Sequence, residues 1–191
     1  MKHKILILIV MCLLPLGAIK AQSFPFMNLS PGEVADCVSK MTGYKDKGDS
    51  APEAFIKVIA KMKMEEVNYA YISTSMFKQI FSLYDEVAGA NGNILSSIKS
   101  IRHFTTTGEN GYKRLRAYMD VFLSEVDAVF GMELQMFNRT DDAYSAVYSD
   151  VNSLLVINDY GENVLSVVFV NGLSYEMFMN IQESGIPFFD F

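Results

Sequence analysis

The chain has no tryptophan, two cysteines and two histidines among its 191 residues. His3 and Cys12 lie in a leading segment with the features of an export signal, so its removal leaves only His103 and Cys37. A Ser-His-Asp or Cys-His catalytic site would have to use these single residues, and a zinc site of histidine and cysteine lacks ligands. An intramolecular disulfide is excluded in the processed chain. This scarcity argues against most nucleophilic, zinc and disulfide chemistry.

The leading segment, residues 1–21, has the composition of a secretory signal peptide. Two lysines precede an apolar run over residues 5–19, and Ala21 is a small residue suited to cleavage. The run is too short and too interrupted for a comfortable membrane span. A bulky methionine precedes Cys12 where a lipoprotein signal needs a small residue, so we do not expect lipidation. We expect cleavage after Ala21 and export to the periplasm, the outer-membrane surface or the medium, with no membrane span left afterwards.

Positive charge is also scarce. Cleavage removes three lysines and no acidic residue, which leaves 13 basic against 22 acidic residues and a net charge of −9. Such a surface argues against binding nucleic acid or anionic lipid through bulk charge. The roughly 170 remaining residues are enough for one domain with its own core. No sequence motif indicates a cofactor.

The processed chain divides into an N-terminal helical segment, residues 22–64, and an α+β domain, residues 65–191. Two capping-box patterns in the first segment predict helix starts, at residues 30–33 and 50–53. Cys37 falls inside the first of these helices. Free cysteine is usually a small buried apolar residue, so a structural role is expected for it.

In the α+β domain, apolar residues alternate between helical and strand-like spacing. Residues 67–73 and 97–106 are predicted as strands, each followed by a helix, and both faces of the first strand are expected to be covered. After Gly131 apolar residues recur at every second position, which predicts strands. Turn-forming residues separate four such short strands, and this order predicts an antiparallel meander. These four strands are residues 132–137, 144–149, 154–157 and 164–170.

The last of these strands, Val164–Val170, is apolar on both faces, so it belongs in the middle of the sheet. Ser174 is expected to cap a final helix that carries Tyr175, Phe178 and Ile181. The expected fold class is α+β, with one mainly antiparallel or mixed sheet, helices packed on it and two extra N-terminal helices.

Two segments resemble a known family. Residues 64–77 are similar to the opening strand and helix of a family of small exported Bacteroidetes proteins, catalogued as domain of unknown function 4252. Their sequence is Met-Glu-Glu-Val-Asn-Tyr-Ala-Tyr-Ile-Ser-Thr-Ser-Met-Phe. Residues 154–172 resemble that family's closing hairpin, which ends in a similar glycine. The resemblance covers about residues 64–181 and implies an exported protein, with no activity or catalytic residue to transfer. The two leading helices, and the lack of a lipoprotein cysteine found in many members, depart from the family's pattern.

Three groups of side chains have the residue types of reactive or metal-binding sites. His103 is suited to general base catalysis, but more often such a lone histidine is held by hydrogen bonds on a strand. Carboxylates in the meander turns suit calcium or acid-base work, although Asp is common in turns for conformational reasons. These acids are Asp141, Asp142, Asp150, Asp159 and Glu162.

The third group is two Met-x-Met pairs. Met62 with Met64, and Met177 with Met179, have the thioether ligands that suit Cu(I). Because residues two apart on a helix point in different directions, and because methionine commonly fills cores, packing is the expected role.

Asp49-Ser50-Ala51 resembles a short acceptor signal for O-linked glycans on exported Bacteroidetes proteins, which makes Ser50 a candidate modification site. The same hydroxyl is placed to cap the helix that starts at Pro52, so the two roles compete.

Three function hypotheses follow from these observations. The first is an exported non-enzymatic module that binds or assists an envelope protein or another partner. The second is a small-molecule or metal binder, and the third is a hydrolase that uses carboxylates alone. A pocket lined by Tyr144, Tyr148 and acids would favour the second or third. With His103, these two tyrosines are the residues expected to face a ligand.

Overall fold

The computed structural model describes residues 50–62, 64–82, 96–124, 126–127 and 130–183. The signal segment, the helix expected around Cys37 and the aromatic residues after position 183 lie outside these ranges. In chain order the elements are α3 (Ala51–Lys61), β1 (Val67–Ser73), α4 (Thr74–Ser82), β2 (Ser100–Thr106), α6 (Glu109–Ser124), β3 (Glu133–Arg139), β4 (Tyr144–Ser149), β5 (Ser153–Asp159), β6 (Leu165–Asn171) and α7 (Tyr175–Glu183).

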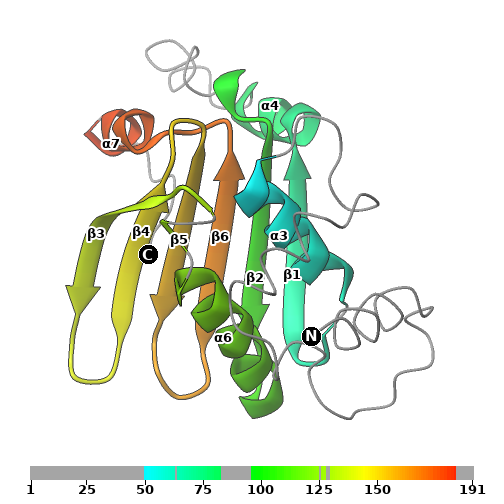
Figure 1. The fold of residues 1–191 in the computed structure, drawn as a ribbon. Coiled ribbons are helices and arrows are strands. Elements are labelled where there is room, and N and C mark those ends of the chain that lie inside the picture. The colour runs from blue at the N-terminus through cyan, green and yellow to red at the C-terminus, as the bar shows by residue number, and fades with distance from the viewer. Residues whose placement is uncertain (1–49, 63, 83–95, 125, 128–129, 184–191) are drawn as a thin grey trace, which may run out of the picture.

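The strands form one six-stranded sheet in the order β1-β2-β6-β5-β4-β3 (Figure 1). Every neighbouring pair is antiparallel. The predicted meander is present as β3 to β6, and the chain places β2 and then β1 beside its last strand. Helices pack on this sheet, so the predicted α+β class is confirmed.

Strand β6 occupies the middle of the sheet, between β2 and β5. Val167, Phe169 and Val170 have no exposed surface, and every residue of β5 is buried. A strand needs neighbours on both edges and layers on both faces to be buried in this way. The predicted central position of Val164–Val170 is therefore confirmed.

Strand β1 does not have the covered position predicted for it. It is an edge strand that pairs only with β2, and Tyr69 and Tyr71 are 42% and 47% exposed. The expectation that both its faces are covered is wrong. Tyrosine has an apolar ring and a polar tip, so its alternation with Ala70 and Ile72 fits a half-solvated edge as well as a buried strand.

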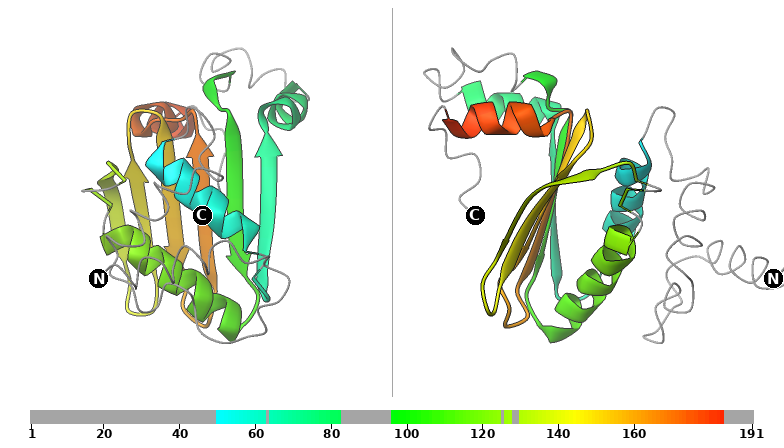
Figure 2. Two further views of the ribbon diagram at one scale, coloured as in Figure 1. Left: turned by 45° about the vertical axis from the view of Figure 1, so that its right-hand side comes forward. Right: turned by 60° about the vertical axis from the view of Figure 1, so that its left-hand side comes forward.

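Two layers of helices build two separate cores. Helices α3 and α6 lie along one face of the sheet, whereas α4 and α7 lie on the opposite face near one end (Figure 2). The first core contains Phe55, Phe104, Met119, Phe122 and Phe169. The second contains Phe77, Val156, Val170, Phe178 and Ile181. Successive residues of the central strands point to opposite faces of the sheet, so their side chains enter the first and the second core in turn.

The start of α6 is fixed by a distant acid. The Glu66 carboxylate accepts hydrogen bonds from the backbone N–H groups of Asn110 (2.9 Å) and Gly111 (3.1 Å), which lie in the first turn of the helix. These N–H groups have no partner inside the helix, so an acidic side chain there satisfies them. A Cβ at Gly111 would lie 2.2 Å from the Glu66 carbonyl oxygen, so only glycine fits this approach.

Candidate functional site

Tyr144 and Tyr148 lie on the face of β4 that packs against the first core, under α3 and α6. They share this face because they are four residues apart on the strand. Both line a pocket of about 450 Å³ between α6 and the β3–β4 hairpin. Helix α6 contributes Tyr112, Arg116 and Leu123 to its wall. The structure thus brings together two of the three residues predicted to face a ligand.

An ionic network around one buried carboxylate forms one wall of this pocket. Asp159, at the end of β5, is only 5% exposed. Its Oδ2 accepts hydrogen bonds from Arg116 Nη1 at 2.5 Å and from the Tyr112 hydroxyl at 2.9 Å, and its Oδ1 accepts from Gly161 N at 3.0 Å. Arg116 Nε also donates to Asp120 Oδ1 at 2.9 Å. Charge-assisted bonds of this kind fix both partners, so the wall is preorganised.

The hydroxyl of Tyr144 is left without a partner. The Arg116 guanidinium lies over the Tyr144 ring, with its Cζ 5.0 Å from the ring centroid. The centroids of the Tyr144 and Phe137 rings are 6.1 Å apart. The hydroxyl oxygen is buried and has no hydrogen-bond partner in the part of the chain that the structure describes. Burial raises the pKa of Tyr144 to about 12, and the opposing effect of the Arg116 charge is smaller. Tyr144 therefore presents a neutral O–H donor that lacks an acceptor.

The rest of the pocket is aromatic on one side and charged at its mouth. Tyr148 is half-buried, and burial together with the Asp127 charge raises its pKa, so it too stays neutral near pH 7. At the hairpin turn, Asp141 and Asp142 are exposed and line the mouth with Arg139. The arrangement suits the binding of a small molecule against aromatic rings.

His103 lies on the opposite face of the sheet from this pocket. Its strand neighbours Arg102 and Phe104 point toward α3 and α6, whereas its Nε2 contacts Thr105 Oγ1 at 2.8 Å and Ser166 Oγ at 3.0 Å. Partial burial lowers the pKa of His103. The third residue predicted to face a ligand is therefore held by hydroxyl groups of its own sheet and is separated from the pocket acids.

Ser50 caps helix α3, as one of its two predicted roles requires. Its hydroxyl accepts a hydrogen bond from Glu53 N at 3.4 Å, and Pro52 is near the helix start. The side chain is half-buried. Glycosylation of Ser50 stays a prediction, and it would have to displace or share this cap.

The two Met-x-Met pairs and the turn acid Asp150 make contacts that stabilise the fold. Met62 and Met64 pack against the first core, and Met177 and Met179 against the second. Asp150 accepts hydrogen bonds from the backbone of Asn152 and Ser153 in its turn. Among the described residues, no three His, Cys, Asp or Glu side chains are grouped so that they could hold a metal ion.

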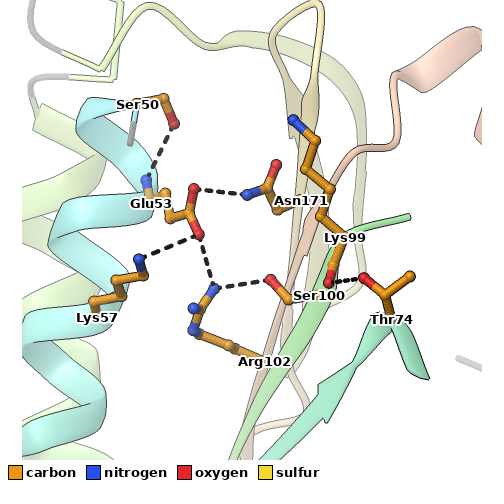
Figure 3. Close-up of polar contacts among 8 residues, drawn as sticks. All are labelled: Ser50, Glu53, Lys57, Thr74, Lys99, Ser100, Arg102 and Asn171. Carbon is orange, nitrogen blue, oxygen red and sulfur yellow. Dashed lines mark hydrogen bonds and ion pairs between the residues drawn. The ribbon is translucent and has the colours of Figure 1, made fainter. Parts of the chain in front are cut away.

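A second buried polar cluster, which the sequence analysis missed, joins α3 to the sheet (Figure 3). Glu53 contacts Arg102 Nη1 at 3.5 Å, Lys57 Nζ at 3.7 Å and Asn171 Nδ2 at 2.6 Å. Arg102 also donates to Ser100 Oγ at 3.1 Å. Glu53 and Arg102 are 8% and 6% exposed, so this cluster is closed to a ligand and fixes the helix on the sheet.

The sequence analysis also missed Arg116 and Tyr112. Helical spacing placed Arg116 off the apolar stripe of α6, where a solvated charge is ordinary. The available signal was Asp159, an acid two residues after the apolar run Leu154–Ile157, because an acid that is buried with such a strand needs a cationic partner.

Comparison with protein-family models, curated proteins and solved structures finds no match to this chain. The resemblance to domain of unknown function 4252 therefore stays a prediction. In the described part of the chain, no helix has the length and apolar character needed to cross a bilayer.

Proposed function

We propose that this chain is an exported, non-enzymatic binding protein of the bacterial cell envelope, and that the pocket of Tyr144 and Tyr148 receives a small organic ligand. The observation that carries the ligand site is the buried Tyr144 hydroxyl, which has no partner among the described residues. A buried polar group without a hydrogen bond costs about 1–3 kcal/mol, so a ligand that supplies an acceptor recovers that energy.

The pocket walls define the chemistry of the proposed ligand. Phe137, Tyr144 and Tyr148 offer ring surfaces, which suit a flat apolar body. The Arg116 charge is already matched by Asp159 and Asp120, so it is not a free anion site. The ligand is therefore an aromatic or alicyclic molecule with a carbonyl or ether oxygen that reaches the Tyr144 hydroxyl.

Two arrangements support a binding role over a catalytic one. The Asp159 carboxylate already accepts bonds from Arg116, Tyr112 and the backbone, so it is committed to the pocket wall. His103, the one histidine beyond the signal segment, lies across the sheet from the pocket acids. A carboxylate hydrolase needs a pair of acids on either side of the substrate, whereas the exposed acids of this pocket, Asp141 and Asp142, are adjacent residues of one turn.

The export part of the proposal rests on the sequence of residues 1–21. The basic start, the apolar run and Ala21 have the order of a secretory signal. The acidic balance of the remaining chain suits a soluble envelope protein that does not bind nucleic acid.

The ligand site is tested by NMR titration of the processed protein with benzamide, acetophenone and coumarin as probes. We expect saturable shifts of backbone signals at Tyr144, Tyr148 and Leu123 with at least one probe. Tyr144→Phe should weaken binding by about tenfold and should not lower the stability of the protein, because the hydroxyl that it removes has no partner. Tyr71→Phe, on the exposed edge strand β1, is the matched control and should change neither quantity, because it keeps the ring and removes only an exposed hydroxyl.

Two results would contradict this site. One is the absence of saturable shifts in the pocket with all three probes. The other is a Tyr144→Phe protein that binds as tightly as the unchanged protein and loses stability, since the hydroxyl would then have a structural partner.

A further inference from the structure

A row of uncharged polar side chains crosses all six strands on the face opposite the first pocket. The strand registers place each member directly beside the next, so they share one face of the sheet. From β1 to β3 the row is Asn68, Thr105, Ser166, Asn158, Ser145 and Asn138. This face carries α4 and α7 near one end (Figure 2). The row lies toward the other end, because Asn68 and Ser166 are near the starts of β1 and β6, whereas α4 and α7 follow the ends of these strands.

The centre of the row contains a buried amide that is not satisfied. Asn158 is 3% exposed, and its Oδ1 accepts a hydrogen bond from Ser145 Oγ at 2.5 Å. Its Nδ2 has no partner in the described chain. Exchanging the two amide atoms would pair the nitrogen with Ser145 and leave the oxygen unpaired instead, so one polar atom of the amide lacks a partner in either orientation. Buried amides are almost always paired, so this one indicates a missing partner.

Asn158 lines a pocket of about 370 Å³ beside α7, within the size range of ligand sites. Met136, Val147, Val156 and Phe178 make its apolar part. The polar side chains around it are uncharged, and they include Asn138, Thr140, Ser145, Tyr160 and Gln182.

Charge distinguishes this pocket from the first one. Among the described residues at its lining, Asp159 is the one charged residue, and its carboxylate is bound by Arg116 and Tyr112 on the other face of the sheet. The lining therefore offers hydroxyl and amide groups that both donate and accept, with no ion to attract a charged ligand. Tyr160 is 46% exposed and lies at the same pocket, where its ring provides a stacking surface.

We propose that this second pocket binds a neutral saccharide. Sugar hydroxyls donate and accept hydrogen bonds, which matches the row of amide and hydroxyl side chains. One sugar oxygen becomes the acceptor for the Asn158 amide, and the C–H face of a sugar ring packs on Tyr160. The site does not depend on the proposed function of the first pocket, because the side chains that define it, Asn138, Ser145 and Asn158, lie on the opposite face of the sheet. Tyr144 and Asp159 border both pockets.

The experiment is a ¹H–¹⁵N NMR titration of the processed protein with maltose, cellobiose and chitobiose as neutral probes. Glucuronate and glucose 6-phosphate serve as charged counterparts. We expect at least one neutral disaccharide to give saturable shifts at the Asn158 side-chain amide, Ser145 and Gln182. The charged sugars should bind at least about tenfold more weakly, because they bring an unmatched charge to an uncharged pocket.

Two variants separate a binding role from a structural one. Asn158→Leu removes the amide from a buried position, and Tyr160→Ala removes a half-exposed ring whose loss leaves the core intact. Each should weaken binding of the neutral sugar by about tenfold. Tyr148→Phe, in the first pocket, is the control and should leave sugar binding unchanged.

Three outcomes would overturn the proposal. They are the absence of saturable shifts with every neutral disaccharide, shifts that map to Tyr148 and Leu123 of the first pocket instead, and equal affinity for neutral and charged sugars. Loss of sugar binding would leave the titrations of the first pocket with aromatic probes unaffected, so the two proposals fail separately.

Discussion

The ion pair between Glu53 and Arg102 gives a prediction that can be worked out in detail. Both side chains are nearly buried, so neither charge has water to replace a lost partner. If Glu53 is replaced by leucine, Arg102 keeps Ser100 Oγ, the Tyr69 hydroxyl and the Tyr71 ring, whose centroid is 5.2 Å from its guanidinium. All three groups are neutral. An uncompensated buried charge is expected to cost about 3–5 kcal/mol of the free energy of unfolding.

The reverse change should cost less. After Arg102→Met, Glu53 keeps the Asn171 amide at 2.6 Å and the Lys57 ammonium at 3.7 Å. We therefore expect a loss of about 1–3 kcal/mol, which is the usual range for a broken buried hydrogen bond. In the double variant both charges are gone together, and the loss should not exceed that of Glu53→Leu alone. The coupling energy between the two sites should be about 2 kcal/mol.

The assay is chemical denaturation of all four proteins followed by circular dichroism, with equal m-values as the condition for comparison. Lys113→Met serves as a matched control, since its ion pair with Glu109 is exposed and should contribute little. The reasoning is refuted if the two single losses add to within about 0.5 kcal/mol in the double variant, because the charges would then be independent.

Four other predictions follow from the fold and the chain. Phe169→Ala should cost about 3–5 kcal/mol in a denaturation curve, since the ring is fully buried in the central strand, and a silent change would contradict that position. Burial lowers the pKa of His103, so the folded state favours the neutral ring and the protein should lose stability as the pH falls below about 6.5. His103→Gln should abolish that part of the pH dependence, and an unchanged profile would show that another group is responsible. Ser50→Ala should cost about 1 kcal/mol through loss of the α3 cap, and a mass increase at Ser50 in the exported protein would show that the hydroxyl is glycosylated instead. Intact-mass analysis of the exported protein should give Gln22 as its first residue, whereas an acylated protein beginning at Cys12 would refute the signal assignment.

Much of the local structure was predictable from spacing. The bounds of β1 and β4 agree with the predicted strands, and the predicted central strand differs from β6 by one residue at each end. The caps at Ser50 and Ser174 were predicted from residue type, and both accept the expected backbone hydrogen bonds. These features depend on neighbours only a few residues away, which a single sequence contains in full.

The first pocket was only half predictable. Tyr144 and Tyr148 were predicted to face a ligand, and they share a face because they are four residues apart on one strand. Arg116 was not, because its partner Asp159 lies 43 positions further along the chain. Helical periodicity says which face of α6 is polar, but it does not say which distant carboxylate will lie opposite.

The sequence by itself determined the helices, the strands, the turns and the alternation of apolar faces, because each of these is set by backbone preferences and contacts over a few residues. Only the tertiary structure decided that β6 pairs with β2, that β1 lies at an edge, and that Glu53 meets Asn171 from 118 positions away. The order of strands in a sheet depends on which pairing buries the most apolar surface across the whole chain, and no local pattern records that outcome. The two unsatisfied groups, the Tyr144 hydroxyl and the Asn158 amide, are visible only once that packing has removed them from water.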